Sequence, residues 1–367
     1  MNILGIILGV FALLGALDKI LGNRLKLGDE FEKGILAAGS LALAMVGIMV
    51  IAPTISKMLI PVLQPVSKFL HIDPSFIAAF IANDGGGATI ARQLSPGTVW
   101  GGYNGLIVAS MMGVTLCFTI PVPLKMVDKK YHKDVLNGIL CGVATMPIGC
   151  IVGGLLVGCP LWALILNTLP VVLVAIITCV GLVLNPEMCR KIFNAIGNFI
   201  LILMTIGLGA GVFAHMTGIV LIPYMDSIEV AFKTVAGIAI FLAGVYPLIA
   251  VMSRLLKAPL AALGKVMKIN EISIVGLIST LANAIPTISL IDKMNSKGII
   301  MNMAFMVSAA FVFGDHFAFT MAYDDSYLLG MVVGKLVSGF CSLIAAHFLY
   351  KYTEKINDIK AKGKDCD

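Results

Sequence analysis

The sequence predicts an all-α polytopic membrane protein, because of its composition, its apolar runs and the lack of an alternating pattern. Of its 367 residues, 59% are hydrophobic and only 13% are charged. A soluble domain of this size cannot bury so much apolar surface. Several apolar runs reach the roughly 20 residues that a helix needs to cross a bilayer. The alternating segments of about ten residues that are typical of a transmembrane β-barrel do not occur.

Nine continuous apolar runs are long enough to be transmembrane helices. The first lies at the N-terminus and has neither a basic leading region nor a clear cleavage site, so we expect a retained span and not a signal peptide. Two further apolar segments, 74–94 and 272–292, are interrupted at their centres. The expected continuous spans are 3–22, 34–52, 99–123, 135–157, 160–184, 192–214, 232–252, 298–320 and 327–350.

The two interrupted segments echo each other. They contain SFIAAFIANDGGGATIARQL (75–94) and SIVGLISTLANAIPTISLID (273–292). Each begins with Ser and an apolar limb, reaches Ala-Asn, turns polar or rich in Gly and Pro, and resumes as a second apolar limb. Interrupted hydrophobic segments in matching positions of two halves indicate the binding site of a transporter.

The basic residues decide whether the interrupted segments cross the membrane. If both return to the side they came from, as re-entrant hairpins, six basic regions that hold 21 of the 26 Lys and Arg fall on one face. The positive-inside rule assigns this face to the cytoplasm. We therefore predict about nine transmembrane helices and two re-entrant helical hairpins, with the N-terminus outside and the C-terminus inside. The hairpins then open to opposite faces, so the two halves form an inverted repeat.

This topology divides the chain into four parts. Each hairpin follows an amphipathic, Pro-bearing stretch, 56–74 or 253–270, which we expect to lie along the membrane interface. The parts are a first transmembrane repeat (1–159, with hairpin 74–94), a connecting helix (160–184), a second, inverted repeat (185–350, with hairpin 272–292) and a basic cytoplasmic tail (351–367).

The tip of the first hairpin carries the most informative polar residues for function, Asn83 and Asp84, which are followed by Gly85 and Gly86. A carboxylate near the bilayer midplane is costly and marks a functional candidate. The glycines let the backbone turn and leave carbonyl groups free to face a ligand. The alternative is that Asp84 only caps the second limb of the hairpin, since Asp is a favoured N-cap. Both readings of Asp84 stay open.

The tip of the second hairpin carries Asn283, whose amide can both donate and accept hydrogen bonds. Pro286 follows and would end one limb and start the next. The alternative for Asn283 is a structural turn with the side chain as a cap, and one residue could serve in both ways.

Asp315 is a further candidate for the binding site, beside His316 in the apolar run 298–320. Counted from the turn at Asp325, Asp315 and Lys335 fall at about the same depth on antiparallel neighbours. A buried structural ion pair between them is therefore the favoured interpretation, ahead of a role in substrate binding. His316 could relay protons, although a lone membrane His is more often only hydrogen-bonded.

The sequence also excludes several functions. It has no Walker A, H-E-x-x-H or G-x-S-x-G motif and no Cys/His cluster with metal spacing, so we expect neither an enzyme nor a bound metal or cofactor. The eight Cys show no C-x-x-C spacing and are interpreted as packing residues. The net charge of +6 fits loops held at an anionic leaflet, so no nucleic-acid partner is expected.

Five segments together resemble the ethanolamine utilisation membrane protein (EutH) family, in order from about residue 3 to residue 350. They are IAPTISKMLIPVLQPVSKFLHIDPSFIAAFIANDGGG (51–87), ASMMG (109–113), MPIGCIVGGL (146–155), LANAIP (281–286) and VSAAFVFGDH (307–316). The resemblance implies a permease of the bacterial plasma membrane that takes up ethanolamine for catabolism. A more distant likeness to concentrative nucleoside transporters, which have gate-type hairpins, is a fold analogy only.

Ethanolamine is a primary amine whose pKa lies near the ~10.4 of Lys, so it enters mostly as a cation. A site for it needs acceptors, which Asp84, Asn83 and Asn283 can supply. Two alternatives stay open: an ion-coupled symporter of another small polar solute such as a nucleoside, and a non-transporting membrane protein that kept a gate-type hairpin. The lipid bilayer is the other expected partner, and a homo-oligomer is compatible with the sequence.

Overall fold

The computed structural model describes the backbone of residues 3–364, and within this range every regular element is a helix. The side chains of Ile3, Leu4, Asp84, Ser253, 256–266 and 356–364 lie outside the described part. Within it, seven helical stretches are long and apolar enough to cross a membrane. The fold is therefore all-α with several candidate spans, as the sequence predicts.

The first half begins with α1 (Ile3–Ile20), which is followed by a single helix of 44 residues. This long helix consists of α2 (Leu27–Leu41), the π-helical turn η1 (Ala42–Val46) and α3 (Gly47–Leu70). The amphipathic stretch from residue 56 thus continues the preceding span. The remaining elements of this half are η2 (Pro74–Phe80), η3 (Asn83–Gly87), α4 (Ala88–Leu94), α5 (Val99–Gly102), η4 (Tyr103–Gly113), η5 (Thr115–Thr119), α6 (Pro121–Met126), η6 (Lys129–Tyr131) and α7 (His132–Leu156).

The second half follows a connecting helix, α8 (Leu161–Leu184), whose bounds agree with the predicted 160–184. Only Asn185 separates α8 from the next helix, since its side chain caps the backbone amide of Met188 and Pro186 is suited to the first helical position. The later elements are α9 (Pro186–Thr217), α10 (Ile228–Met267), α11 (Glu271–Ala282), α12 (Ala284–Ser289), η7 (Ile291–Lys293), α13 (Ser296–Ala309), α14 (Asp315–Asp324), η8 (Asp325–Tyr327) and α15 (Leu328–Lys364).

One predicted span is wrong as a continuous helix. The run 298–320 is broken between α13 and α14, where Phe311 has a left-handed φ of 61°. The cause is tertiary, because the amides of Phe311 and Phe313 donate to carbonyl oxygens at the C-terminal end of α11. These bonds satisfy carbonyls that the end of a helix leaves without an intrahelical partner.

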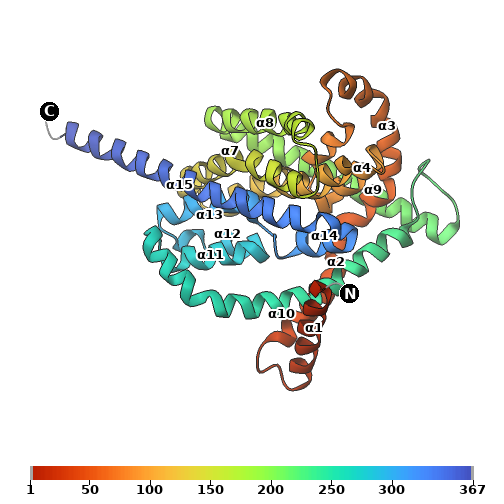
Figure 1. Ribbon diagram of the computed structural model, residues 1–367, viewed down its shortest axis with the longest axis horizontal. Coiled ribbons are helices and arrows are strands. Elements are labelled where there is room, and N and C mark those ends of the chain that lie inside the picture. The colour runs from red at the N-terminus through yellow and green to blue at the C-terminus, as the bar shows by residue number, and fades with distance from the viewer. Residues whose placement is uncertain (1–2, 365–367) are drawn as a thin grey trace.

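The helices α7, α13 and α15 pack on one another in the centre of the molecule (Figure 1). The contact of α7 with α15 is close, because Gly149 and Gly153 meet the backbone of Gly334 and Gly330 with no room for a Cβ atom. Small residues at this spacing allow helix backbones to approach in membranes. The small residues Gly149, Gly153 and Gly154 of the apolar run 135–157 are typical of such a close contact.

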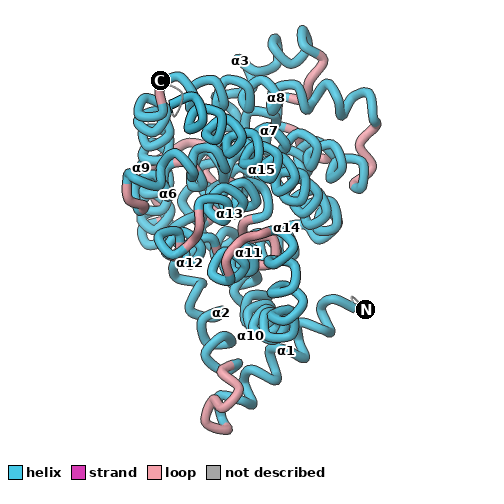
Figure 2. The backbone as a smooth tube through the Cα atoms, turned by 90° about the vertical axis from the view of Figure 1, so that its left-hand side faces the viewer, coloured by secondary structure: helices cyan, strands magenta, loops and turns pink. Residues whose placement is uncertain are grey.

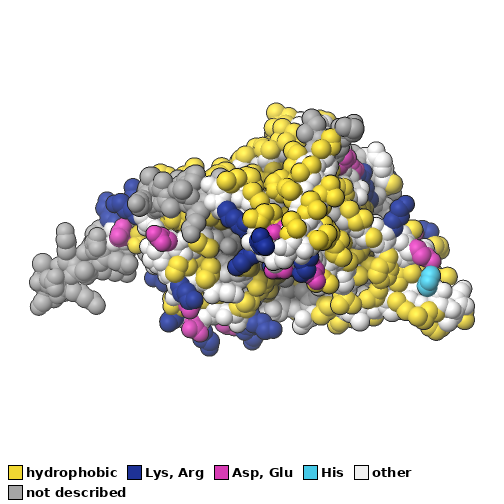
Figure 3. Space-filling view, turned by 90° about the horizontal axis from the view of Figure 1, so that it is seen from below, with side chains coloured by type: hydrophobic (Ala, Val, Ile, Leu, Met, Phe, Trp, Pro, Cys, Tyr) yellow, Lys and Arg dark blue, Asp and Glu magenta, His cyan; other side chains and the backbone are white. Residues whose placement is uncertain are grey.

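The helices α1, α2 and α10 lie together along one edge of the molecule, as two views at right angles show (Figures 1 and 2). The C-terminal part of α15 projects beyond the body, so the predicted tail is helical up to Lys364. Hydrophobic side chains cover most of the face in Figure 3, and Lys and Arg gather densely near the end from which α15 projects. Such a surface suits a protein held in lipid.

Candidate functional site

The first interrupted segment folds back on itself, so that its two ends meet. Asp73 caps η2 by accepting a hydrogen bond from the amide of Ser75 at 2.9 Å. The second carboxylate oxygen of Asp73 accepts a hydrogen bond from the hydroxyl of Ser95 at 2.7 Å, just beyond the end of α4. The segment between them is therefore a helical hairpin with a closed base.

The second interrupted segment has the same form. Asn270 caps α11 at the amide of Ser273, and its Nδ2 donates to the carbonyl oxygen of Lys293 at 2.8 Å. Between the limbs, the hydroxyl of Thr287 on α12 donates to the carbonyl oxygen of Gly276 on α11 at 2.7 Å. The chain therefore turns back at Asn283, and both ends of the hairpin lie together.

Each hairpin is also anchored to the following helix by an Asn side chain. Asn104 in η4 donates to the hydroxyl of Ser75 at 2.9 Å, and Asn302 in α13 donates to the carbonyl oxygen of Ser273 at 2.8 Å. Both pairs are 29 residues apart in the sequence. The two halves thus hold their hairpins by the same kind of contact at the same spacing.

The tip of the first hairpin depends on glycine. Gly86 has a φ of 105°, which is favourable only for glycine, and a Cβ atom there would collide with Ile48 of α3. Gly87 is the N-cap residue of α4 and, as a glycine, has no side chain that could cap the helix. The side chain of Asp84 lies outside the described part of the structure, so both the ligand role and the capping role of Asp84 stay predictions.

Asn83, at the same tip, is fully buried and yet unsatisfied. Its exposed fraction is 0%, and neither its amide nitrogen nor its amide oxygen has a hydrogen-bond partner among the described residues. Burying polar groups in this way typically costs about 1–3 kcal/mol. An unpaired buried amide next to a break in a membrane helix is a candidate for contact with a ligand or with a rearranged tip.

Asn283 forms the cap that the sequence suggested. Its Oδ1 accepts a hydrogen bond from the amide of Ile285 at 2.8 Å, at the start of α12. The side chain is otherwise exposed, and this bond uses only its oxygen. The NH₂ group of Asn283 therefore remains suited to donating to a solute.

The break between α13 and α14 forms a third interruption, which the sequence analysis missed. The amide of Phe311 donates to the carbonyl oxygen of Thr280 at 3.0 Å, and the amide of Phe313 donates to that of Leu281 at 2.8 Å. These bonds bring the start of α14 to the tip of the second hairpin. The only signal in the sequence was the polar group Gly314-Asp315-His316 within an apolar run.

Asp315 stands at the start of α14 and faces α10. Its Oδ1 accepts a hydrogen bond from the hydroxyl of Tyr246 at 3.0 Å. Lys335 of α15 is buried and donates to the carbonyl oxygen of Ser110. The ion pairs between described side chains do not include Asp315 with Lys335, so the expected pair is wrong. The depth count assumed a continuous helix, whereas the break before Asp315 resets its position.

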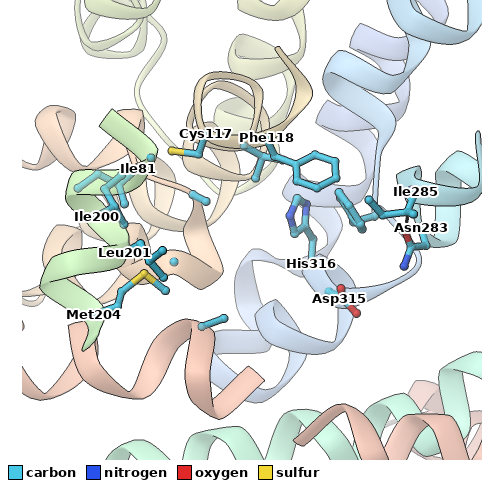
Figure 4. Close-up of a pocket in the computed structure, with 16 residues that line it drawn as sticks. Ile81, Cys117, Phe118, Ile200, Leu201, Met204, Asn283, Ile285, Asp315 and His316 are labelled. Atoms are coloured by element: carbon cyan, nitrogen blue, oxygen red, sulfur yellow. Dashed lines mark hydrogen bonds between the residues drawn. The ribbon is translucent and has the colours of Figure 1, made fainter. Parts of the chain in front are cut away.

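A cavity of about 470 Å³ lies where these interruptions meet (Figure 4). Of the predicted site residues, Gly85, Asn283 and Asp315 line it, while Asn83 and Gly86 do not. Figure 4 shows Asp315 and His316 between the second hairpin, which carries Asn283, and the wall formed by α9. The lining residues are Ala44, Ile81, Ala82, Gly85, Val114, Cys117, Phe118, Gly197, Ile200, Leu201, Met204, Asn283, Ile285, Phe311, Asp315 and His316.

Among the described residues the lining is mostly apolar, with the carboxylate of Asp315 and the rings of Phe118 and Phe311 in it. The rings of Phe118 and Phe311 meet edge to face at 5.5 Å, and the ring of Phe311 lies 5.3 Å from that of His316. Aromatic faces attract cations. A few polar groups in an apolar cavity is the usual composition of a small-molecule site. No pattern in the sequence pointed to the rings of Phe118 and Phe311 or to Tyr246.

A metal centre finds no support in the described residues, which contain no group of three or more His, Cys, Asp or Glu side chains placed to hold an ion. The chemistry of the cavity is therefore that of its carboxylate, amide, imidazole and rings. This set of groups can bind a small cation that also carries a hydrogen-bonding group.

The family model described as "Ethanolamine utilisation protein, EutH" matches residues 1–349. The chain belongs to the EutH family. A EutH relative from Listeria monocytogenes, named "Probable ethanolamine permease EutH", is 41% identical over 96% of this chain and 94% of its own length. The Escherichia coli protein of the same name is 38% identical over 88% of this chain and 85% of its own length.

An uncharacterised EutH relative from Bacillus subtilis, YxeR, is 37% identical over 94% of this chain and 93% of its own length. No solved structure matches. Because relatives over nearly the whole chain are named as permeases, and because the chain has several apolar helices, it is a multi-pass membrane transporter and not an enzyme.

Proposed function

We propose that this EutH protein takes up ethanolamine, as the protonated cation, into the bacterial cytoplasm for catabolism. The observation that carries the proposal is the carboxylate of Asp315, which lines a mostly apolar cavity beside the two hairpin tips. A carboxylate in such surroundings favours a cationic ligand. The names of the relatives point to the same solute.

The binding mode follows from the unused groups of the cavity. The hydroxyl of Tyr246 engages one oxygen of Asp315, which leaves the other for the ammonium group. The rings of Phe118 and Phe311 give the cation an aromatic wall. The NH₂ group of Asn283 donates to the hydroxyl oxygen of the solute. These contacts would distinguish ethanolamine from an amine without a hydroxyl group.

The first tip completes the site in this proposal. Asp84 supplies a second carboxylate, and the backbone at Gly85 and Gly86 supplies acceptors. Asn83 gains the partners that it lacks when the tip closes on the solute. What supports this is the place of Gly85 in the cavity and the unsatisfied amide of Asn83.

The architecture we propose is the inverted repeat expected from the charges. The first repeat is 1–159 and the second is 185–350, joined by the helix 160–184, with the tail 351–367 in the cytoplasm. The matched anchors Asn104–Ser75 and Asn302–Ser273 support it. Alternating access in such folds comes from rocking of one repeat against the other around a central site.

In this proposal, the membrane potential alone can drive accumulation of the cation, so no coupled ion is needed. A monovalent cation gains about 2.3 kcal/mol on entering a cell held at 100 mV inside-negative, which corresponds to about fiftyfold accumulation. An ion-coupled symporter of a larger polar solute, such as a nucleoside, is the second candidate. The observation in its favour is the size of the cavity, about 470 Å³, which is generous for ethanolamine.

The decisive experiment measures radiolabelled ethanolamine uptake into proteoliposomes at two membrane potentials. We expect the steady-state accumulation to rise about fiftyfold between zero and 100 mV inside-negative. The variants Asp315→Asn and Asp84→Asn should lower uptake about thirtyfold, since a hydrogen bond to a charged group contributes about 2 kcal/mol.

The matched control is Glu187→Gln, which removes a carboxylate from an exposed ion pair with Arg190 and should leave uptake unchanged. Uptake that does not respond to potential, or that needs a sodium or proton gradient, would favour the symporter. Absence of ethanolamine binding to the purified protein would favour a non-transporting role.

A further inference from the structure

Polar residues line the contact between the second limb of the first hairpin, α4, and the helix α14. At the end of α4, Arg92 forms an ion pair with Asp324 at the end of α14. The side chains are 28% and 26% exposed, so the pair sits at the edge of the packed region. The guanidinium carbon of Arg92 also lies 5.4 Å from the ring centre of Tyr327, which gives Arg92 a second partner.

Two threonines extend this contact inward. Thr89 precedes Arg92 by nearly one helical turn, and Thr320 precedes Asp324 by one turn, so each lies on the same face of its helix as the charged residue. Thr89 is 9% exposed and Thr320 is 0% exposed. The hydroxyl of Thr320 has no hydrogen-bond partner among the described residues, whereas that of Thr89 lies beside the hydroxyl of Tyr323.

We call this polar contact the α4–α14 seam; its residues are Thr89, Arg92, Thr320, Tyr323 and Asp324. Tyr323 connects the two helices. The hydroxyl of Tyr323 lies 3.5 Å from the carbonyl oxygen of Ala88 at the start of α4. Through Tyr323 and Asp324, the C-terminal end of α14 therefore reaches both the start and the end of α4.

The inner end of the seam opens on the cavity. Gly85 precedes Thr89 by four residues, across the break in the helix at Gly86, and His316 lies one turn before Thr320 on α14; both Gly85 and His316 line the cavity. His316 is 2% exposed, and its Nδ1 has no hydrogen-bond partner among the described residues. Polar side chains of the α4–α14 seam thus connect the cavity with the Arg92–Asp324 pair.

Apolar side chains would pack this contact at lower cost, because a buried hydroxyl without a partner is destabilising. A row of buried polar side chains in which the Thr320 hydroxyl and the His316 Nδ1 lack described partners suits a passage that a polar solute occupies for part of the time. We propose that the α4–α14 seam is the path by which the cationic solute moves between the cavity and one membrane face, and that the Arg92–Asp324 ion pair closes it in this conformation.

The chemistry of the pair fits a cation. When Arg92 leaves Asp324 for the ring of Tyr327, the Oδ2 atom of Asp324 can receive an ammonium group, while Oδ1 keeps its hydrogen bonds from the amide and the hydroxyl of Ser326. The Thr89 and Thr320 hydroxyls then offer oxygen acceptors along the path. The solute class is a small primary amine, and in this respect the inference rests on the function proposed above.

The test uses chemical labelling, which does not require transport. The full-length protein with the substitution Thr89→Cys is purified and treated with 2-aminoethyl methanethiosulfonate, a cation that carries the same 2-aminoethyl group as ethanolamine. The rate of mixed-disulfide formation at position 89 is followed by mass spectrometry of the peptide that contains it. Adding Asp324→Asn should raise this rate about fivefold, the factor expected from loss of a partly exposed ion pair.

Two controls sharpen the result. The exchange of charges, Arg92→Asp with Asp324→Arg, should restore slow labelling, and Glu187→Gln, which opens an ion pair elsewhere, should not change it. Equal rates with and without Asp324→Asn would overturn the closing role of the pair, and so would fast labelling in the charge exchange. If Thr89→Cys fails to fold, Thr320→Cys reports on the same seam.

The outcome is separable from that of the proposed function. If ethanolamine is not the solute, uptake fails while the labelling pattern stands. If Asp315→Asn abolishes uptake but breaking the ion pair leaves labelling unchanged, the site holds and the solute enters by another path.

Discussion

At the scale of single residues, the binding properties of the cavity depend on the donor and acceptor atoms that its polar side chains do not use in hydrogen bonds within the protein. Asp315 gives one oxygen to Tyr246, and Asn283 gives its oxygen to the amide of Ile285. Asn83 gives nothing to any described partner. In the proposed site, a small cation with a hydroxyl group would find an acceptor in Asp315 and a donor in Asn283, which line the cavity, and Asn83, which does not line it, would take part only after the tip moves.

The hydroxyl of Tyr246 should hold the carboxylate of Asp315 in place for the ammonium group. Tyr246→Phe keeps the ring and removes this hydrogen bond, which contributes about 1.5 kcal/mol when the acceptor is charged. We expect the ethanolamine concentration for half-maximal uptake to rise about tenfold. Tyr352→Phe, at an exposed position on α15, is the matched control, and an equal effect of both variants would remove Tyr246 from the site.

We expect Asn83 to lower the stability of the protein and to be required for uptake. Asn83→Leu removes two unsatisfied polar atoms from a fully buried position, so we expect a gain of about 1 kcal/mol or more in the free energy of unfolding. The same change should abolish uptake. The measurements are the melting temperature of the purified protein in detergent and uptake in proteoliposomes. A less stable variant with normal uptake would make Asn83 a structural residue.

At the scale of elements, the sequence predicted what depends on local patterns and missed what depends on tertiary contacts. The apolar runs predicted most helices, and the polar and Gly/Pro interruptions located both hairpins. The break before α14 could not be predicted in this way, because hydrogen bonds from Phe311 and Phe313 to a distant helix end cause it. The error over Asp315 and Lys335 followed directly from this missed break.

The first tip is held by a close backbone approach that can be tested. A Cβ atom on Gly113 of η4 would clash with the carbonyl group of Ile81, which is backbone and cannot rotate away. Gly113→Ala should therefore lower the free energy of unfolding by about 1–3 kcal/mol and impair uptake. Gly39→Ala on α2, where nothing lies within 4 Å of the new atom, should be neutral or slightly stabilising. Similar effects of the two variants on unfolding in detergent would contradict this reading of the tip.

At the scale of the whole molecule, the charges of the loops and the contacts of the hairpins support one arrangement. The basic regions favour hairpins that open to opposite membrane faces. The hairpins themselves are closed at their bases by Asp73 with Ser95 and by Asn270 with Lys293. A segment whose ends meet in this way returns to the face from which it started.

The inverted arrangement predicts that the two hairpin bases face opposite sides of the membrane. Single cysteines at the exposed positions His71 and Lys293 should react with an impermeant maleimide from opposite sides of sealed, oriented vesicles. The parent protein with its native cysteines gives the background. Reaction of both positions from one side would rule out the inverted repeat.

The Asn104–Ser75 and Asn302–Ser273 contacts hold both hairpins near their bases. A rigid hairpin held at its base moves most at its tip, so a slight tilt at either contact becomes a larger displacement at the cavity. In the proposed inverted repeat, two hairpins held by matched contacts would need similar free energies to tilt from either leaflet. Such a carrier would exchange its outward and inward forms at little net cost, and the membrane potential would set the direction in which the proposed cation moves.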